Sequence, residues 1–310
     1  MRIGIIDFGT NTLRLDIFET EDTGYHNIFD YAIYSKIVES TVGTSLSQDG
    51  IEHVIQSIEE HQAICRHYRC ARVECFSTAS LRYIDNAASV LEQVEFRTGI
   101  HIRCISGDEE AHYDFLALRA VSESKSGVGC DLGGGSIQVF TFDENGPVKS
   151  TSFPLGSSRV AKEFSAGAIP TEKEIAAIEE KLCSSLAEAG FVPGQKRLFT
   201  MGGTAKTMAA FRRRTLQKDG AIPLGELETI LSVLSAEPEE SLELIEDIEP
   251  KRSRTLVPGM AVLAGVMRFF GCEEMEVFGV GVREGFLESL LNGGEPETPN
   301  ILDVILGSLS

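Results

Sequence analysis

The feature that most constrains the fold of this chain is a repeated motif, in which a short apolar strand, an aspartate, a glycine turn and a second strand occur twice. The first copy, IGIIDFGTNTLRLDIF, covers residues 3–18, and the second, VGCDLGGGSIQVFTF, covers residues 128–142. Three positions of the first copy match similar residues of the second: Asp7 matches Asp131, Gly9 matches Gly133, and Thr12 matches Ser136. The repeat predicts a chain built from two similar halves.

Each copy of the motif is typical of a β-hairpin with an aspartate at the entrance of its turn. Leu13, Leu15 and Ile17 alternate with other residues, which is the period of a half-buried strand. The N–H groups of a glycine turn suit phosphate oxygens, and aspartates suit Mg²⁺. The alternative to a shared functional site is that the two hairpins are unrelated and have only a structural role. We predict phosphate-binding turns at Gly9, Thr10, Asn11 and Thr12 and at Gly133, Gly134, Gly135 and Ser136, with Asp7 and Asp131 as metal ligands.

The periodicity of the whole chain predicts an α/β fold, in which each half opens with three strands and continues with helices and strands. The predicted strands are 2–8, 12–20, 25–35, 71–77, 101–105, 127–131, 136–143, 148–154, 197–200 and 275–279. The predicted helices are 51–68, 85–98, 107–122, 157–165, 171–189, 203–215, 224–234, 239–246, 258–271 and 283–292. The polar stretch SESKSG predicts a boundary between domains 1–124 and 125–297. The apolar tail, 298–310, is expected to form a helix on the first domain.

Composition limits the classes of function. A net charge of −19 argues against broad nucleic-acid binding, which needs a basic face, so any phosphate site must be local. The N-terminal apolar stretch contains Asp7 and is a poor signal peptide, and the apolar stretch 258–270 is too short to span a bilayer. Seven cysteines without a C-x-x-C pair indicate reduced thiols rather than zinc ligands. These features predict a cytoplasmic protein.

Eight motifs occur in one order along the chain: IIDFGTNTLRL, FSTASLR, ISGDEEA, CDLGGGS, PLGSSR, MGGTAKTM, RSRTLVPGMAVLAG and GVREGFL. In this order they resemble the exopolyphosphatase and guanosine pentaphosphate phosphohydrolase (Ppx/GppA) family, in its short two-domain form. The resemblance implies two actin-like (ribonuclease H-like) domains with the active site in the cleft between them. It also implies hydrolysis of a terminal phosphate with Mg²⁺ or Mn²⁺, and a possible homodimer.

The same resemblance implies roles for single residues. Glu110 matches the glutamate that orients or deprotonates the attacking water, and Arg82 matches the arginine that binds phosphate. Asp7 and Asp131 match the acidic residues that hold Mg²⁺.

Local chemistry separates Glu110 from its neighbour Glu109. Ser106 followed three residues later by Glu109 is a capping box, which gives Glu109 a structural role at the start of a helix. Glu110 has no role in the capping box. If it is not catalytic, it would simply complement the positive end of the helix dipole. A carboxylate that activates water needs only to lie within hydrogen-bond reach of it.

Two further features suit anions. Gly202, Gly203 and Thr204 precede a helix whose N-terminus is a natural anion site, although a tight turn would need the same residues. The strongest basic clusters are Arg212, Arg213 and Arg214, and Lys251, Arg252 and Arg254. Each cluster either lies on a solvated surface or guides a long polyanion to the site.

Three positions depart from the family pattern. Gln138 stands where the family has a glutamate, His112 where it has an arginine, and Arg254 where it often has an acidic residue. Glutamine keeps the shape of glutamate but loses its charge. Gln138 therefore predicts weaker metal binding or water activation, with slow or altered turnover.

The sequence leaves four functions open. The leading one is a Mg²⁺-dependent exopolyphosphatase, and the nearest alternative is a 5′-phosphohydrolase of pppGpp, a nucleotide of the stringent response. A non-hydrolysing sensor of polyphosphate or of guanosine penta- or tetraphosphate belongs to a different class, and the missing carboxylate at Gln138 favours it. A kinase of the same superfold is more remote, because the chain lacks a recognisable sugar-binding or acid-binding domain.

Overall fold

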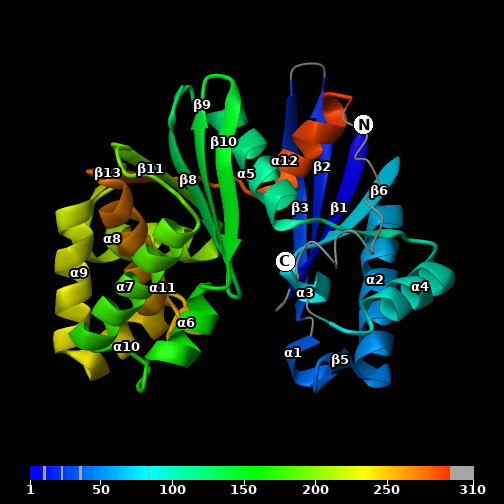
Figure 1. The fold of residues 1–310 in the computed structure, drawn as a ribbon. Helices are drawn as coiled ribbons and strands as arrows, with labels where there is room; N and C mark the ends of the chain where they lie inside the picture. The colour runs from blue at the N-terminus through cyan, green and yellow to red at the C-terminus, as the bar shows by residue number, and fades with distance from the viewer. Residues whose placement is uncertain (10–11, 22–23, 35–36, 83, 294–310) are drawn as a thin grey trace. The chain divides into compact units, whose positions relative to one another are not determined.

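The structure is a computed structural model that describes residues 1–9, 12–21, 24–34, 37–82 and 84–293. The chain divides into two compact units, Met1–Glu109 joined by residues 290–293, and Glu110–Ser289 (Figure 1). The division falls inside helix α5 (Gly107–Val121), one helix before the polar stretch at which the sequence predicts a boundary. The tail helix predicted at 298–310 lies outside the described residues.

The first unit is built on a five-stranded sheet in the order β3-β2-β1-β6-β7. Its strands are β1 (Arg2–Phe8), β2 (Thr12–Glu21), β3 (Gly24–Tyr34), β6 (Arg72–Ser77) and β7 (Ile102–Cys104). The first three form an antiparallel meander, and β6 and β7 run parallel to β1. The longer helices of this unit are α2 (Gln48–His67) and α4 (Ala87–Thr98).

Helix α2 shows how the sequence folds this unit. Ser47 caps the helix, because its hydroxyl accepts a hydrogen bond of 3.2 Å from the Gly50 N–H. Ile51, Val54 and Ile58 recur at helical spacing and are buried in the core beside the sheet. An apolar stripe of this kind drives a helix onto a sheet, at about 25 cal/mol for each Å² of apolar surface removed from water.

The second unit has a six-stranded sheet in the order β10-β9-β8-β11-β13-β12. Its strands are β8 (Gly127–Leu132), β9 (Ile137–Asp143), β10 (Gly146–Phe153), β11 (Arg197–Met201), β12 (Ile222–Pro223) and β13 (Glu274–Val277). The helices that follow α5 are α6 (Ser157–Phe164), α7 (Glu172–Glu188), α8 (Gly202–Leu216), α9 (Leu224–Ala236), α10 (Pro238–Ile248), α11 (Leu256–Phe270) and α12 (Val282–Leu291). Thirteen residues of α11 are buried, which makes it the central core helix.

The two faces of this second sheet bury different side chains. Cys130 and Val139 face a core that includes residues of α7 and α11. Phe140, Phe142 and Phe199 face the opposite way and pack against Ala111, Phe115 and Leu118 of α5. Helix α5 therefore covers one face of the sheet, and α7 and α11 lie on the other (Figure 1).

The predicted helices and strands occur in the predicted order, with ends that shift by a few residues. Six short elements were not predicted: α1 (Ile37–Ser40), β4 (Thr41–Val42), β5 (Ser45–Leu46), α3 (Ala79–Arg82), β12 and the 3₁₀ turn η1 (Pro250–Arg252). Elements of four residues or fewer cannot show a hydrophobic period. Among the described residues, no helix has the length and apolarity needed to cross a membrane.

Candidate functional site

The first unit gathers several predicted residues at one edge of its sheet. Phe8 of β1 lies opposite Ser77 of β6, and Ser77 lies opposite Cys104 of β7, so the carboxyl ends of three parallel strands meet there. The Ser80 hydroxyl donates to the Phe8 carbonyl and joins the start of α3 to the end of β1. The first glycine turn, α3 and the start of α5 all follow these strand ends.

The described part of the first turn has the predicted form. The Gly9 N–H donates to the Thr12 carbonyl at 3.0 Å, which closes the turn between β1 and β2. Asp7 is half-buried at the end of β1 and lies opposite Arg14. Thr10, Asn11 and the side chain of Arg82 lie outside the described residues, and the backbone of Arg82 ends α3.

The predicted capping box is present at the start of α5. The Ser106 N–H donates to Glu109 Oε2 at 2.7 Å, and the Glu109 N–H donates to Ser106 Oγ at 3.1 Å. Arg103, which is 8% exposed, also donates to Glu109. Glu109 thus has three local contacts. Glu110 is buried at 8% exposure and is the first residue of the second unit.

The second glycine turn is held by the loop that leads into α6. The Gly133 N–H donates to the Ser136 carbonyl at 3.0 Å, as in the first turn, and the Ser158 N–H donates to the Gly134 carbonyl at 2.9 Å. A Cβ at Gly156 would lie 2.4 Å from the Ser136 nitrogen, so only glycine fits there. The PLGSSR motif therefore serves to support the turn.

The start of α8 approaches Asp131 closely. Gly202 has φ +88°, and a Cβ there would lie 2.2 Å from Asp131 Oδ1. A Cβ at Gly203 would lie 1.9 Å from Arg252 Nη2, and Arg252 Nη1 donates to Thr204 Oγ1 at 3.2 Å. The structure thus places Gly202, Gly203 and Thr204 between a carboxylate and a guanidinium.

The electrostatics of Asp131 reflect these neighbours. Burial raises the pKa of Asp131 from 3.8 to about 6, and the nearby Glu284 acts in the same direction. Lys206, Arg283 and Arg252 are also close and act to lower this pKa. Cations and helix N–H groups beside one carboxylate form an environment for anions and for a metal ion.

Lys206 and Arg283 were not among the predicted site residues, yet both lie close to Asp131. Lys206 lies on the first turns of α8 and donates to the Gly279 carbonyl at 2.6 Å, and Arg283 lies on the first turn of α12. Both stand inside quoted motifs, MGGTAKTM and GVREGFL. The sequence did offer one indication. Each residue lies near the start of a helix that follows a parallel strand, and the carboxyl ends of parallel strands meet at one edge of the sheet.

At the other end of α8, each arginine of the first basic cluster forms an ion pair with a carboxylate of the same unit. Arg212 pairs with Glu226, Arg213 with Asp219, and Arg214 with Asp247. In each pair the carboxylate neutralises the charge of the arginine. These three arginines therefore do not support the idea that the cluster guides a long polyanion. Arg252 of the second cluster lies instead at the start of α8.

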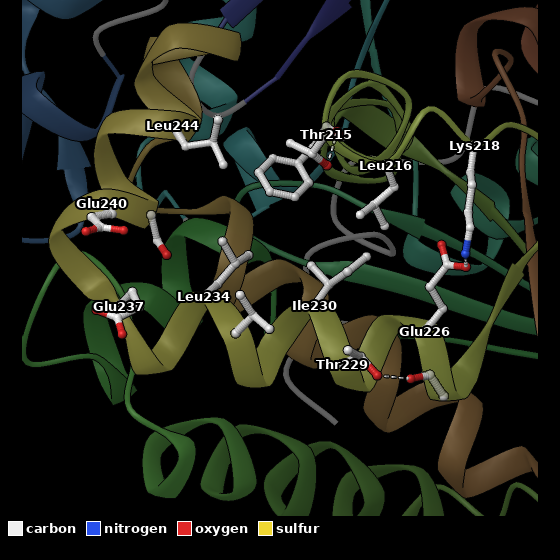
Figure 2. Close-up of a pocket in the computed structure, with 14 residues that line it drawn as sticks. Thr215, Leu216, Lys218, Glu226, Thr229, Ile230, Leu234, Glu237, Glu240 and Leu244 are labelled. Atoms are coloured by element: carbon white, nitrogen blue, oxygen red, sulfur yellow. Dashed lines mark hydrogen bonds and ion pairs between the residues drawn. The ribbon is translucent and has the colours of Figure 1, made fainter.

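A groove of about 660 Å³ lies between the end of α8, α9 and α10 (Figure 2). Its lining is mostly apolar and includes Leu216, Val233 and Leu244, one partly exposed residue from each of the three helices. Helix α8 has 15 residues, so this groove is about 20 Å along the helix from Gly202. It is a separate feature from the glycine-turn site.

Comparisons with known proteins agree with the quoted motifs. The family model described as the Ppx/GppA phosphatase family matches residues 26–293. The chain is 26% identical to exopolyphosphatase 1 of Mycobacterium tuberculosis over 306 residues, which covers 93% of this chain and 87% of that protein.

Two solved structures share the fold. A crystal structure of the Aquifex aeolicus Ppx/GppA family member matches with a TM-score of 0.84 at 23% identity, over 96% of this chain and 99% of that one. An exopolyphosphatase of Cytophaga hutchinsonii matches with a TM-score of 0.78 at 18% identity, over 94% and 98% of the two chains. The predicted fold, α/β with two actin-like domains, is confirmed. With motifs, family model and fold in agreement, the chain belongs to the Ppx/GppA phosphatase family.

Proposed function

We propose that this chain is a Mg²⁺-dependent exopolyphosphatase, which removes the terminal phosphate of inorganic polyphosphate by in-line attack of water. The observation that carries the proposal is the group around Asp131, which is close to Lys206 on the first turns of α8, to Arg252 and to Arg283. The Mycobacterium tuberculosis relative named exopolyphosphatase 1 supports the same substrate class.

Phosphate binding needs local positive charge in a chain of net charge −19. The N–H groups at the start of α8 point out of the helix and carry its positive dipole end. The guanidinium of Arg252 lies against Gly203 at this point, and a planar guanidinium suits phosphate oxygens. A polyphosphate end bound here would be neutralised without a broad basic surface.

The side chains suit Mg²⁺ or Mn²⁺ by the chemistry of their donors. Among the described residues, no three His, Cys, Asp or Glu side chains form a metal-binding group. Mg²⁺ usually takes only one or two carboxylates and completes its shell with water and substrate phosphate. In the second unit Asp131 would hold the ion, and Asp7 occupies the equivalent place at the strand end of the first unit. When bound, the ion would neutralise charge on the phosphates.

Glu110 is the proposed base for the attacking water. In the reaction the water oxygen bonds to the terminal phosphorus, the bridging P–O bond breaks, and the water gives up a proton. Glu110 would accept that proton. Glu110 is buried, and the capping box of this helix is made by Glu109 instead.

The proposed function is tested by phosphate release from polyphosphate and from pppGpp, each with Mg²⁺ and with EDTA. We expect Mg²⁺-dependent release that is faster from polyphosphate. Faster release from pppGpp would make the chain a pppGpp 5′-phosphohydrolase. Binding of either substrate without release would make it a sensor.

Mg²⁺ binding is expected to depend on pH through Asp131. Because burial raises its pKa to about 6, this carboxyl gains a proton as pH falls through 6, and the protonated form is a poor metal ligand. Calorimetry at several values between about pH 5 and pH 8 would measure the affinity for Mg²⁺. This affinity should fall about tenfold for each pH unit below 6. Asp131→Asn should bind Mg²⁺ weakly and without this pH dependence. Affinity that stays constant down to pH 5 would contradict the assignment.

A further inference from the structure

The side chain of Gln138 lies in a row of polar residues that crosses the sheet of the second unit. Asp131 of β8 lies opposite Gln138 of β9, which lies opposite Ser152 of β10. Ile137 and Val139, its chain neighbours, are buried in the core on the other face. Gln138 therefore points to the face that α5 covers, and it is 2% exposed.

Both hydrogens of the Gln138 amide are used in hydrogen bonds to serine hydroxyls. Nε2 donates to Ser136 Oγ at 3.0 Å and to Ser152 Oγ at 3.1 Å. A hydroxyl that accepts such a bond keeps its own hydrogen for another acceptor. Ser136 closes the second glycine turn, so its hydrogen becomes available at that turn.

The backbone around Ser136 leaves the hydroxyl as the adjustable part of the turn. The Ser136 carbonyl accepts a hydrogen bond from the Gly133 N–H, and the backbone of Gly156 lies close to the Ser136 nitrogen. The backbone of the turn does not determine the direction in which the Ser136 hydroxyl donates its hydrogen, and the hydrogen bond from Gln138 can determine it.

We propose that Gln138 is a positioning residue, which holds the Ser136 hydroxyl by its oxygen so that the Ser136 O–H donates to a substrate phosphate oxygen. This proposal rests on the proposed function, because it needs a phosphate bound at the second glycine turn. It gives the amide at position 138 a use that a carboxylate cannot supply.

A glutamate at this position would reverse the hydrogen bonds. A carboxylate only accepts, so it would take the hydrogens of Ser136 and Ser152 and leave the lone pairs of Ser136 facing the phosphate. It would also add a negative charge in the same row as Asp131. Both changes oppose the binding of an anion.

The experiment compares Gln138→Glu, Gln138→Met, Ser136→Ala and the double variant Ser136→Ala with Gln138→Met. Binding of tripolyphosphate with Mg²⁺ is measured by calorimetry, together with KM and kcat for polyphosphate. We expect Ser136→Ala and Gln138→Glu each to weaken binding and raise KM about tenfold, with a much smaller change in kcat, because a hydrogen bond to a charged group is lost. The double variant should bind no more weakly than Ser136→Ala alone.

Ser152→Ala is the matched control, because it removes the same kind of bond from the same amide away from the turn. We expect it to bind tripolyphosphate as the unaltered protein does. Equal losses in Ser152→Ala and Ser136→Ala would overturn the proposal, since the amide would then only support the sheet. A Gln138→Glu protein with a higher Mg²⁺-dependent kcat and unchanged binding would also overturn it, and would assign a metal-related role to this position.

The same data separate this proposal from the proposed function. If the unaltered protein neither binds tripolyphosphate nor releases phosphate, both fail. If it does both and Gln138→Glu binds equally well, only the positioning role fails. Thermal unfolding of each variant shows whether its fold is retained.

Discussion

Glu110→Gln is expected to lower kcat for polyphosphate by about 10²–10⁴-fold, which is the usual contribution of general base catalysis. Glutamine has nearly the same shape but cannot accept the proton of the attacking water. Each tenfold loss corresponds to about 1.4 kcal/mol of transition-state stabilisation, so the effect amounts to about 3–5 kcal/mol. KM should change little, because the substrate phosphates are held elsewhere. Initial rates of phosphate release with saturating Mg²⁺ measure the effect.

Glu109→Gln is the matched control, since it makes the same chemical change one residue earlier. Glu109 contacts the Ser106 N–H and Arg103, and a glutamine side chain can still complete the capping box. We expect kcat to stay within a few-fold of the original, while the free energy of unfolding falls by about 2 kcal/mol, because the buried Arg103 loses a charged hydrogen-bond partner. If the losses of the two variants were reversed, Glu109 would be the base and the assignment of Glu110 would be wrong.

Gly285→Ala is expected to destabilise the second unit by about 3 kcal/mol, the upper part of the range for overpacking. A Cβ on Gly285 would lie 1.7 Å from the Tyr113 carbonyl oxygen and 2.4 Å from its carbon. Both belong to backbone that cannot rotate away, so α12 and α5 would have to separate. The midpoint of thermal unfolding should fall by about 6–12 °C for a unit of this size.

Gly225→Ala, at the start of α9, provides the comparison. A Cβ there meets no atom within 4 Å, and alanine favours a helix more than glycine does. Its midpoint should therefore be unchanged or slightly higher. A Gly285→Ala protein that unfolds at the same temperature as Gly225→Ala would show that the contact between α5 and α12 is adjustable.

The sequence was sufficient for those parts of the fold and site that depend on local spacing. The alternation of Leu13 and Leu15 predicts β2, and the repeat places Asp7 and Asp131 at equivalent strand ends, as the structure shows. The spacing of Ser106 and Glu109 predicts the capping box, which is present. In each case the signal is a pattern within one short segment of the sequence.

Parts of the site that depend on distant contacts were not predicted. Lys206 and Arg283 influence Asp131 from separate helices, and no spacing in the sequence relates these three residues. Of the two hydroxyls that Gln138 binds, Ser136 lies only two residues away in the glycine turn. Ser152 becomes a neighbour only through the register of β9 and β10. Such proximity is a property of the folded sheet.

The contacts of Glu109 have a consequence for natural variation in this family. Arg103 is buried and binds the first glutamate of the pair, so loss of the acid at 109 would remove a charged partner from a buried cation. Among homologous sequences, positions 103 and 109 should therefore change together, while position 110 should stay glutamate wherever turnover is retained. The adjacent glutamates would then follow separate evolutionary histories, one tied to folding and the other to selection on turnover.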